Sequence, residues 1–125
     1  MTRDELIAHA MTWPGAAEDY PFGEDLLTVK VGGRVFAWIP LSDAGWLGQG
    51  ARVALKARPD VVDDLRHAYP ADVRDARPLD QRYWVTIRLG GAISDDELVE
   101  LVAASYAEVV AGLPRRLRPP THDHP

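Results

Sequence analysis

The chain has 125 residues, of which 46% are hydrophobic and 26% charged, and this is the size and composition of one soluble globular domain. It contains no cysteine, which excludes disulfides, thiolate metal sites and cysteine nucleophiles, and its net charge of -5 argues against a general polyanion binder. No apolar run approaches the roughly 20 residues that span a bilayer, and the N-terminus lacks a secretory signal, so we expect a cytoplasmic protein with no membrane contact.

Three helices are predicted from capping signals and apolar spacing. The first begins with a capping box at Thr2 and ends before Pro14. The second, over 59–68, begins with a proline, which is favoured at the first helical position. The third, over 95–112, follows another capping box and carries its leucines and valines mainly on one face.

Strands are predicted wherever apolar and polar residues alternate with a period of two. The four predicted strands lie at about 26–31, 34–40, 52–57 and 83–89. The resulting order α-β-β-β-α-β-α predicts an α+β fold, an antiparallel β-sheet with helices packed on one face and the other face largely open. We expect a single domain over 1–114 and a flexible C-terminal tail over 115–125.

The hairpin around Gly32-Gly33 has two possible registers, and they place different side chains on the open face. A strict two-residue turn pairs Val31 with Arg34 and puts the apolar residues of the two strands on opposite faces. A three-residue loop with a glycine bulge keeps the valines of both strands on the core side. Because burial favours the bulge, we expect it to form and Phe36 to lie on the open face.

Basic and aromatic side chains share this open face in the expected register. Lysine and arginine neutralise phosphates, and tryptophan stacks on bases or on a cation. The combination predicts a nucleic-acid-binding surface; the alternatives are a solvated face with cross-strand cation–aromatic pairs, or a dimer interface. The candidate nucleic-acid-binding residues are Lys30, Arg34, Trp38, Arg52, Lys56, Arg82, Trp84 and Arg88.

The remaining motifs predict no catalytic or metal site. The glycine-rich stretch 45–50 lies between two strands and begins no helix, so it indicates a hairpin loop rather than a phosphate loop. His122 and His124 lack a fixed third metal ligand. The carboxylate pairs lie at helix starts, where the helix dipole accounts for them, and no Ser-His-acid set is evident. We therefore expect no enzyme activity, no metal and no cofactor.

A series of short motifs runs in a specific order along most of the chain. It consists of Pro14-Gly15, Tyr20-Pro21-Phe22-Gly23, Lys30-Val31-Gly32-Gly33-Arg34-Val35-Phe36-Ala37, Leu55-Lys56, Tyr69-Pro70, Arg82 with Trp84-Val85-Thr86, Ser105-Tyr106 and Leu113-Pro114. Over about residues 5–115 the chain thereby resembles the MmcQ/YjbR family of small bacterial proteins. The resemblance implies a CyaY-like (frataxin-like) two-layer sandwich and DNA binding through a double-wing arrangement. The chain departs from the family over 78–83, where an acid and a neutral amide replace polar and basic residues.

Two functions remain as hypotheses. The first is a non-enzymatic DNA-binding protein in which the basic residues contact about four to six phosphates, which predicts a slope of log affinity against log salt of roughly −4 to −5. The second is a protein- or small-ligand-binding module, a monomer or weak homodimer, that uses the same open face. Salt-dependent DNA binding favours the first, and a stable dimer that shields Trp38 and Trp84 favours the second.

Overall fold

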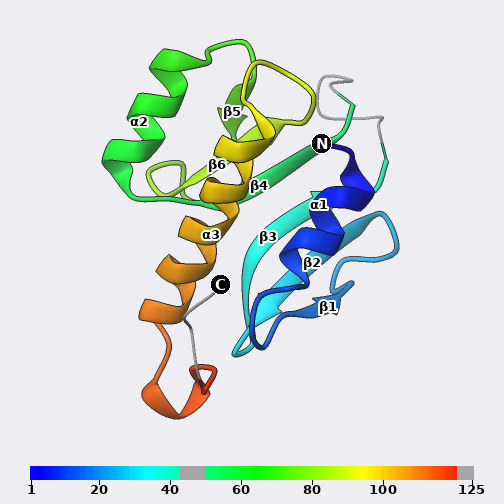
Figure 1. Ribbon diagram of the computed structural model, residues 1–125, viewed down its shortest axis with the longest axis vertical. Coiled ribbons are helices and arrows are strands. Elements are labelled where there is room, and N and C mark those ends of the chain that lie inside the picture. The colour runs from blue at the N-terminus through cyan, green and yellow to red at the C-terminus, as the bar shows by residue number, and fades with distance from the viewer. Residues whose placement is uncertain (43–49, 121–125) are drawn as a thin grey trace.

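The structure, a computed structural model, describes residues 1–42 and 50–120. Within these residues six strands form one antiparallel sheet in the order β1-β2-β3-β4-β6-β5 (Figure 1). The strands are β1 (Ala17–Asp19), β2 (Leu26–Val31), β3 (Arg34–Pro40), β4 (Arg52–Lys56), β5 (Val73–Asp75) and β6 (Trp84–Arg88). The four predicted strands are present within one residue of their expected ends. The two that were not predicted, β1 and β5, have three residues each, too few for an alternating pattern to appear.

Three α-helices accompany the sheet, as predicted. They are α1 (Arg3–Ala10), α2 (Pro59–Ala68) and α3 (Asp95–Ala111), and a 3₁₀ turn, η2 (Arg115–Leu117), follows α3. Helices α1 and α3 lie over one face of the sheet, whereas α2 lies beyond its β5 edge (Figure 1). The architecture is therefore α+β with helices on one face, and two short edge strands are added to the expected order.

Capping hydrogen bonds explain where the helices begin. At α1 the Thr2 hydroxyl accepts from the backbone N–H of Glu5 at 3.1 Å, and the Glu5 carboxylate accepts from the N–H of Thr2 at 3.0 Å. At α3 the Ser94 hydroxyl accepts from the N–H of Glu97 at 3.1 Å. These side chains satisfy donors that the first helical turn leaves without partners, so the capping residues fix both starts.

The β2–β3 hairpin differs from its predicted register. Val31 pairs with Arg34 across a two-residue turn, so the predicted three-residue loop is wrong. Both turn glycines have positive φ, 58° at Gly32 and 82° at Gly33, as the favoured tight hairpin turns require. The bulge lies within the strands instead of in the turn. Lys30 pairs with Val35 and Val29 with Ala37, so Phe36 is an extra residue of β3 without a partner in β2.

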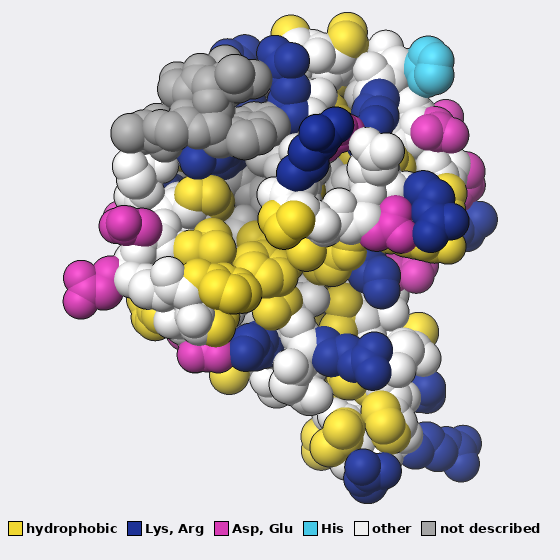
Figure 2. Space-filling model, turned by 180° about the vertical axis from the view of Figure 1, so that it is seen from behind, with side chains coloured by type: hydrophobic (Ala, Val, Ile, Leu, Met, Phe, Trp, Pro, Cys, Tyr) yellow, Lys and Arg dark blue, Asp and Glu magenta, His cyan; other side chains and the backbone are white. Residues whose placement is uncertain are grey.

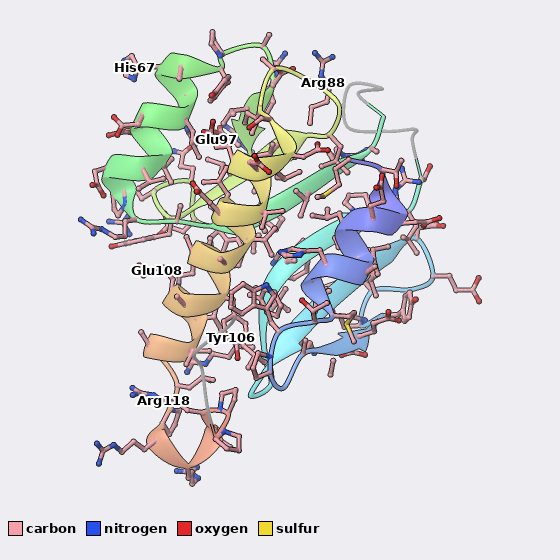
Figure 3. The ribbon with its side chains drawn as sticks, viewed as in Figure 1. His67, Arg88, Glu97, Tyr106, Glu108 and Arg118 are labelled. Carbon is pink, nitrogen blue, oxygen red and sulfur yellow. The ribbon has the colours of Figure 1, made fainter. Side chains whose placement is uncertain are left out.

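The bulge turns Phe36 into the core, so its predicted place on the open face is wrong. Phe36 and the adjacent Ala37 are both buried, and the Phe36 ring packs edge-on against Tyr106 of α3 with 5.3 Å between centroids. Tyr106 points from α3 toward the sheet (Figure 3), and its hydroxyl donates to the carbonyl of Pro14 at 2.6 Å. One aromatic contact therefore joins the hairpin and α3, and one hydrogen bond joins α3 to the segment after α1.

A serine of α3 separates β3 from β4. These strands pair only at Ala37 with Leu55 and at Trp38 with Ala54, so the next ladder bond would join Phe36 and Lys56. Instead the fully buried Ser105 hydroxyl donates to the Phe36 carbonyl at 2.6 Å and accepts from the Lys56 N–H at 2.9 Å. The hydroxyl takes the place of the direct bond, and the two strands diverge beyond this point.

Candidate binding site on the open sheet face

The strand register determines which side chains share the face away from the helices. Cross-strand partners lie on the same face of a sheet, and so do residues two positions further along. Trp38, Ala54 and Thr86 form one row across β3, β4 and β6. Arg52 pairs with Arg88 on one side of this row, and Lys56 with Trp84 on the other. Lys30 joins the same face, because Thr28 pairs with Trp38.

The two other predicted residues lie at the margins. Arg34 pairs with Val31, which points into the core, and its own side chain is exposed at the end of the hairpin. Arg82 lies in the segment before β6 and is also exposed. The open face thus brings together six of the eight predicted residues, with Arg34 and Arg82 at its ends.

Three of the predicted cations are paired with acidic side chains. Lys30 Nζ lies 2.6 Å from Asp19 of β1, and this contact holds the pKa of the Asp19 carboxyl below its usual range. Arg82 donates hydrogen bonds to the Asp80 carboxylate from Nε at 3.2 Å and from Nη2 at 2.9 Å, and these bonds lower the pKa of Asp80. These two cations are therefore largely neutralised before any partner arrives.

The third pair, between Arg88 and Asp72, is partly buried. Asp72 is 5% exposed and lies 2.6 Å from Arg88 Nη2, while its second oxygen accepts from the Ala92 N–H at 2.8 Å. The hydrogen bond from Ala92, together with Arg88, keeps the pKa of the Asp72 carboxyl below its usual range. Gly91 allows this approach, because a Cβ there would lie 2.7 Å from the carboxylate.

Arg52 serves the structure as well. It is only 7% exposed, and its Nη1 donates to the carbonyl of Gly50 at 2.9 Å. Within the described residues, Arg34 and Lys56 are the predicted cations that have no acid within 4.0 Å. The surface offers a phosphate far less unpaired positive charge than the sequence indicates.

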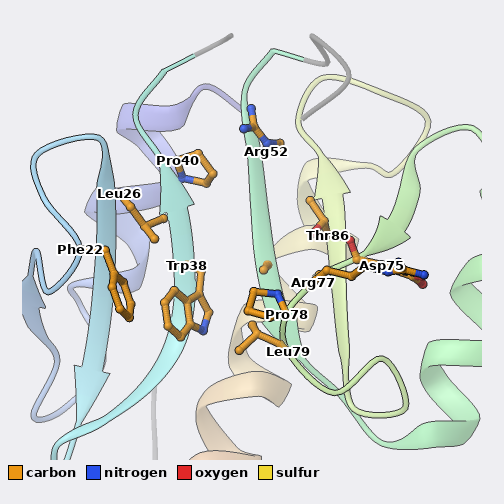
Figure 4. A pocket seen from close by; sticks show the side chains of 12 residues that line it. Phe22, Leu26, Trp38, Pro40, Arg52, Asp75, Arg77, Pro78, Leu79 and Thr86 are labelled. Carbon is orange, nitrogen blue, oxygen red and sulfur yellow. Dashed lines mark hydrogen bonds and ion pairs between the residues drawn. The ribbon is translucent and has the colours of Figure 1, made fainter. Parts of the chain in front are cut away.

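The centre of the open face is an apolar groove of about 530 Å³. Phe22, in the segment between β1 and β2, stacks on Trp38 with 5.8 Å between ring centroids and 18° between planes. Pro78 and Leu79, in the segment between β5 and β6, face this pair across the sheet (Figure 4). We call this concavity the apolar groove. Most of its lining is apolar, and Arg52, Asp75, Arg77 and Thr86 also line it; the apolar lining comes from Phe22, Leu26, Trp38, Pro40, Ala54, Ala76, Pro78 and Leu79.

Charge lies around the groove rather than within its centre. Yellow apolar side chains gather in the middle of this face and dark-blue cations lie around them (Figure 2). Asp75, at one side, is paired with Arg66 at 2.8 Å and with Arg77 at 3.7 Å. The groove is thus suited to an apolar group with little net charge.

Sequence reasoning missed the walls of this groove, because it searched the strands and the walls are loop residues. Phe22, Pro78 and Leu79 had no part in the predicted site. The sequence does carry a signal at Phe22, because an apolar ring in a segment otherwise rich in proline, glycine and acids indicates a contact surface. In the structure Phe22 is 71% exposed. Pro78 and Leu79 belong to the stretch that was noted only for its missing basic residues.

Other candidate chemistry finds no support within the described residues. They contain no group of three histidine or acidic side chains that could hold a metal ion. No helix among them is long and apolar enough to cross a membrane. The glycine-rich stretch before Gly50 and the two C-terminal histidines lie outside the described residues.

Comparison with known proteins places the chain in a family. The YjbR family model matches residues 11–108. The uncharacterised protein YjbR of Escherichia coli K12 is 31% identical over 118 residues, which cover 94% of this chain and 95% of that protein.

Solved structures share the fold. The crystal structure of Deinococcus radiodurans protein DR2400, described by its domain DUF419, superposes with a TM-score of 0.81 at 26% identity, covering 99% of this chain and 96% of that one. A Pseudomonas syringae protein superposes with a TM-score of 0.67 at 22% identity, covering 84% of this chain and 96% of that one, and this likeness concerns the fold alone.

Proposed function

The chain belongs to the YjbR family, and we propose that it is a non-enzymatic binding protein whose apolar groove takes a small ligand with a flat apolar ring. The observation that carries the proposal is the Phe22–Trp38 stack, in which the outer ring is 71% exposed. An aromatic ring held rigidly at the surface gains contact area with little loss of entropy when a ligand covers it.

The size and lining of the groove agree with this ligand class. Small-molecule sites typically measure about 300–1,000 Å³ and are lined mainly by apolar side chains with a few polar groups. Here the apolar groove measures about 530 Å³, and Arg52 and Thr86 supply polar atoms along one side. The Trp38 face and the Pro78 and Leu79 side chains lie at opposite walls, so a flat ring between them contacts both.

A fluorescence titration with the neutral dye N-phenyl-1-naphthylamine tests the proposal. Replacing Phe22 by alanine removes one ring of the stack, and we expect about a tenfold loss of dye affinity, since a well-packed aromatic contact contributes about 1–2 kcal/mol. Tyr20→Ala is the matched control, because Tyr20 is an exposed aromatic of the same segment that does not line the groove. Equal affinity of the wild type, Phe22→Ala and Tyr20→Ala proteins would refute the proposal.

DNA binding is a second candidate, favoured by Lys56, Arg34 and Trp84. Lys56 and Trp84 are cross-strand partners on the open face. Neither Lys56 nor Arg34 has an acid within 4.0 Å in the described part of the chain. With two available cations rather than four to six, the slope of log affinity against log salt is expected to be about −2. A slope near −4 or −5 would mean that the paired arginines leave their acids on binding, and salt-independent binding would refute this candidate.

Three further features stay part of the proposal. They are the CyaY-like relationship of the fold, the double-wing arrangement that goes with DNA binding, and a cytoplasmic location. Each was expected from the sequence or from the family resemblance.

A further inference from the structure

A second concavity, separate in chemistry from the apolar groove, lies where β3 and β4 diverge. It measures about 250 Å³ and is lined by Arg34, Val35, Trp38, Lys56, Trp84 and α3 residues Val109 and Gly112. We call it the strand cleft. It exists because Ser105 replaces the direct Phe36–Lys56 ladder bond, so α3 forms the floor behind the separated strands (Figure 4).

The strand cleft carries unbalanced positive charge. Arg34 and Lys56 line it, and among the described residues no acidic side chain does. Neither cation has an acid within 4.0 Å among the residues that the structure describes. Two cations without partners around one small concavity favour an occupant with about two negative charges, such as a phosphate monoester, which carries about −1.5 to −2 at pH 7.

The end of α3 does not cancel this charge. Helix C-termini carry partial negative charge on carbonyls that lack partners. Here Arg118 donates through Nη2 to the carbonyl of Ala111 and through Nε to that of Leu113, both at 3.1 Å, on either side of Gly112 (Figure 3). The guanidinium satisfies these carbonyls and so offsets the negative end of α3, whose Gly112 lines the cleft. The neighbouring Arg115 and Arg116 are exposed, and this end of the molecule is dark blue in Figure 2.

Two indoles supply the remaining part of the lining. Trp38 and Trp84 come from β3 and β6, so they border the strand cleft from two sides. Indole faces stack on flat rings, and base–aromatic stacking contributes about 1–3 kcal/mol per base. The Trp38 Nε1 is buried and has no hydrogen-bond partner within the described residues.

We propose that the strand cleft binds a flat aromatic ring that carries a phosphate group. Arg34 and Lys56 contact the phosphate, and Trp38 and Trp84 contact the ring. The ring–phosphate unit can come from a free nucleotide, whose phosphate monoester carries about two negative charges, or from one nucleotide of a single strand, whose two flanking phosphodiesters carry one negative charge each. This site is independent of the ligand in the apolar groove, although Trp38 borders both.

Titration of ¹⁵N-labelled protein with adenosine monophosphate tests the proposal. We expect the indole N–H signals of Trp38 and Trp84 to shift and that of Trp13, which lines neither concavity, to stay. Lys56→Gln and Arg34→Gln should each weaken binding at least tenfold, since each variant loses a hydrogen bond from a charged group to the phosphate. Adenosine and inorganic phosphate, each carrying half of the unit, should bind at least tenfold more weakly.

Arg82→Gln is the matched control. It removes the same charge from an exposed arginine that lies outside the strand cleft and is already paired with Asp80. An Arg82→Gln protein that loses as much affinity as Lys56→Gln, or a titration that moves no tryptophan signal at millimolar nucleotide, would overturn the proposal. The amide spectrum of each variant verifies that it is folded.

The same variants separate this site from the apolar groove. Lys56→Gln should leave binding of the neutral naphthylamine dye unchanged, and Phe22→Ala should weaken binding of the dye more than binding of the nucleotide, because Phe22 lines only the apolar groove. A parallel titration with single-stranded oligo(dA) distinguishes a free nucleotide from a nucleotide within a strand. Tighter binding of the oligomer with a steeper salt dependence indicates a strand, and equal or weaker binding indicates a free nucleotide.

Discussion

Replacing Ser105 by alanine removes the hydroxyl that holds β3 and β4 apart. The side chain is fully buried in α3, and its oxygen donates to the Phe36 carbonyl at 2.6 Å and accepts from the Lys56 N–H at 2.9 Å. The alanine variant keeps the packing of the Cβ and loses both hydrogen bonds. Two backbone groups beneath α3 are then left without partners, unless the strands shift to pair directly.

The size of the effect follows from these two groups. Leaving a buried donor or acceptor unsatisfied costs about 1–3 kcal/mol, so the pair costs about 2–6 kcal/mol. A domain of this kind is stable by about 5–15 kcal/mol, so Ser105→Ala removes a large part of the free energy of unfolding. With a urea m-value of about 2 kcal/mol/M, the midpoint falls by roughly 1–3 M.

Urea unfolding followed by circular dichroism measures this loss. Ser94→Ala is the comparison variant, because Ser94 caps the same helix at an exposed position and its loss should cost about 1 kcal/mol. A Ser105→Ala protein that loses less than about 0.5 kcal/mol, or no more than Ser94→Ala, would refute the role given to the hydroxyl.

Three further variants test the contacts around the sheet. Hydrogen bonds from Ala92 and Arg88 keep the pKa of Asp72 below its unfolded value, so the carboxylate stabilises the fold above about pH 4 and this contribution is lost as pH falls through the lower folded pKa. Asp72→Asn should therefore lower stability at pH 7, and its melting temperature should fall less than that of the wild type between pH 5 and pH 2. An unchanged dependence of the melting temperature on pH would contradict this. Gly91→Ala places a Cβ 2.7 Å from the same carboxylate and should lower the melting temperature by several degrees, whereas a neutral effect means that the Asp72 loop yields. Tyr106→Phe loses the hydrogen bond to Pro14 and should cost about 1 kcal/mol in urea, and no loss would mean that the bond adds nothing.

Local signals in the sequence were sufficient for most of the fold. The capping residues Thr2 and Ser94 fix helix starts through contacts three residues away, and alternation identified the four longer strands. The short strands β1 and β5 escaped, because three residues carry no period and only their partners β2 and β6 define them. Architecture was therefore predictable where the determinants lie close together in the chain.

The hairpin register depended on information that the hairpin itself does not contain. The two glycines permit a tight turn or a looser loop, and burial of the valines favoured the looser loop. The structure satisfies burial differently, with a bulge at Phe36 that turns its ring onto Tyr106, 70 residues later in the chain. A partner on α3, rather than a feature of the strand, decides where Phe36 points.

The same limit applies to the candidate site. The alternating pattern of the strands predicted cations on the open face, but it could not show that Lys30 is paired with Asp19 and Arg88 with Asp72. These acids come from the edge strand β1 and from the residue before β5, neither of which was predicted. The apolar groove was missed for a related reason, since its walls at Phe22 and Leu79 belong to the segments that those edge strands position.

Contacts between a bound neutral ring and the stacked pair at Phe22 and Trp38 test the central claim most directly. Intermolecular NOEs from N-phenyl-1-naphthylamine to assigned protein protons report them without any change to the protein. Binding in the apolar groove predicts NOEs from the dye to the Phe22 and Trp38 rings and to the Leu79 methyl groups. NOEs confined to other surfaces, or none at saturating dye, would contradict it.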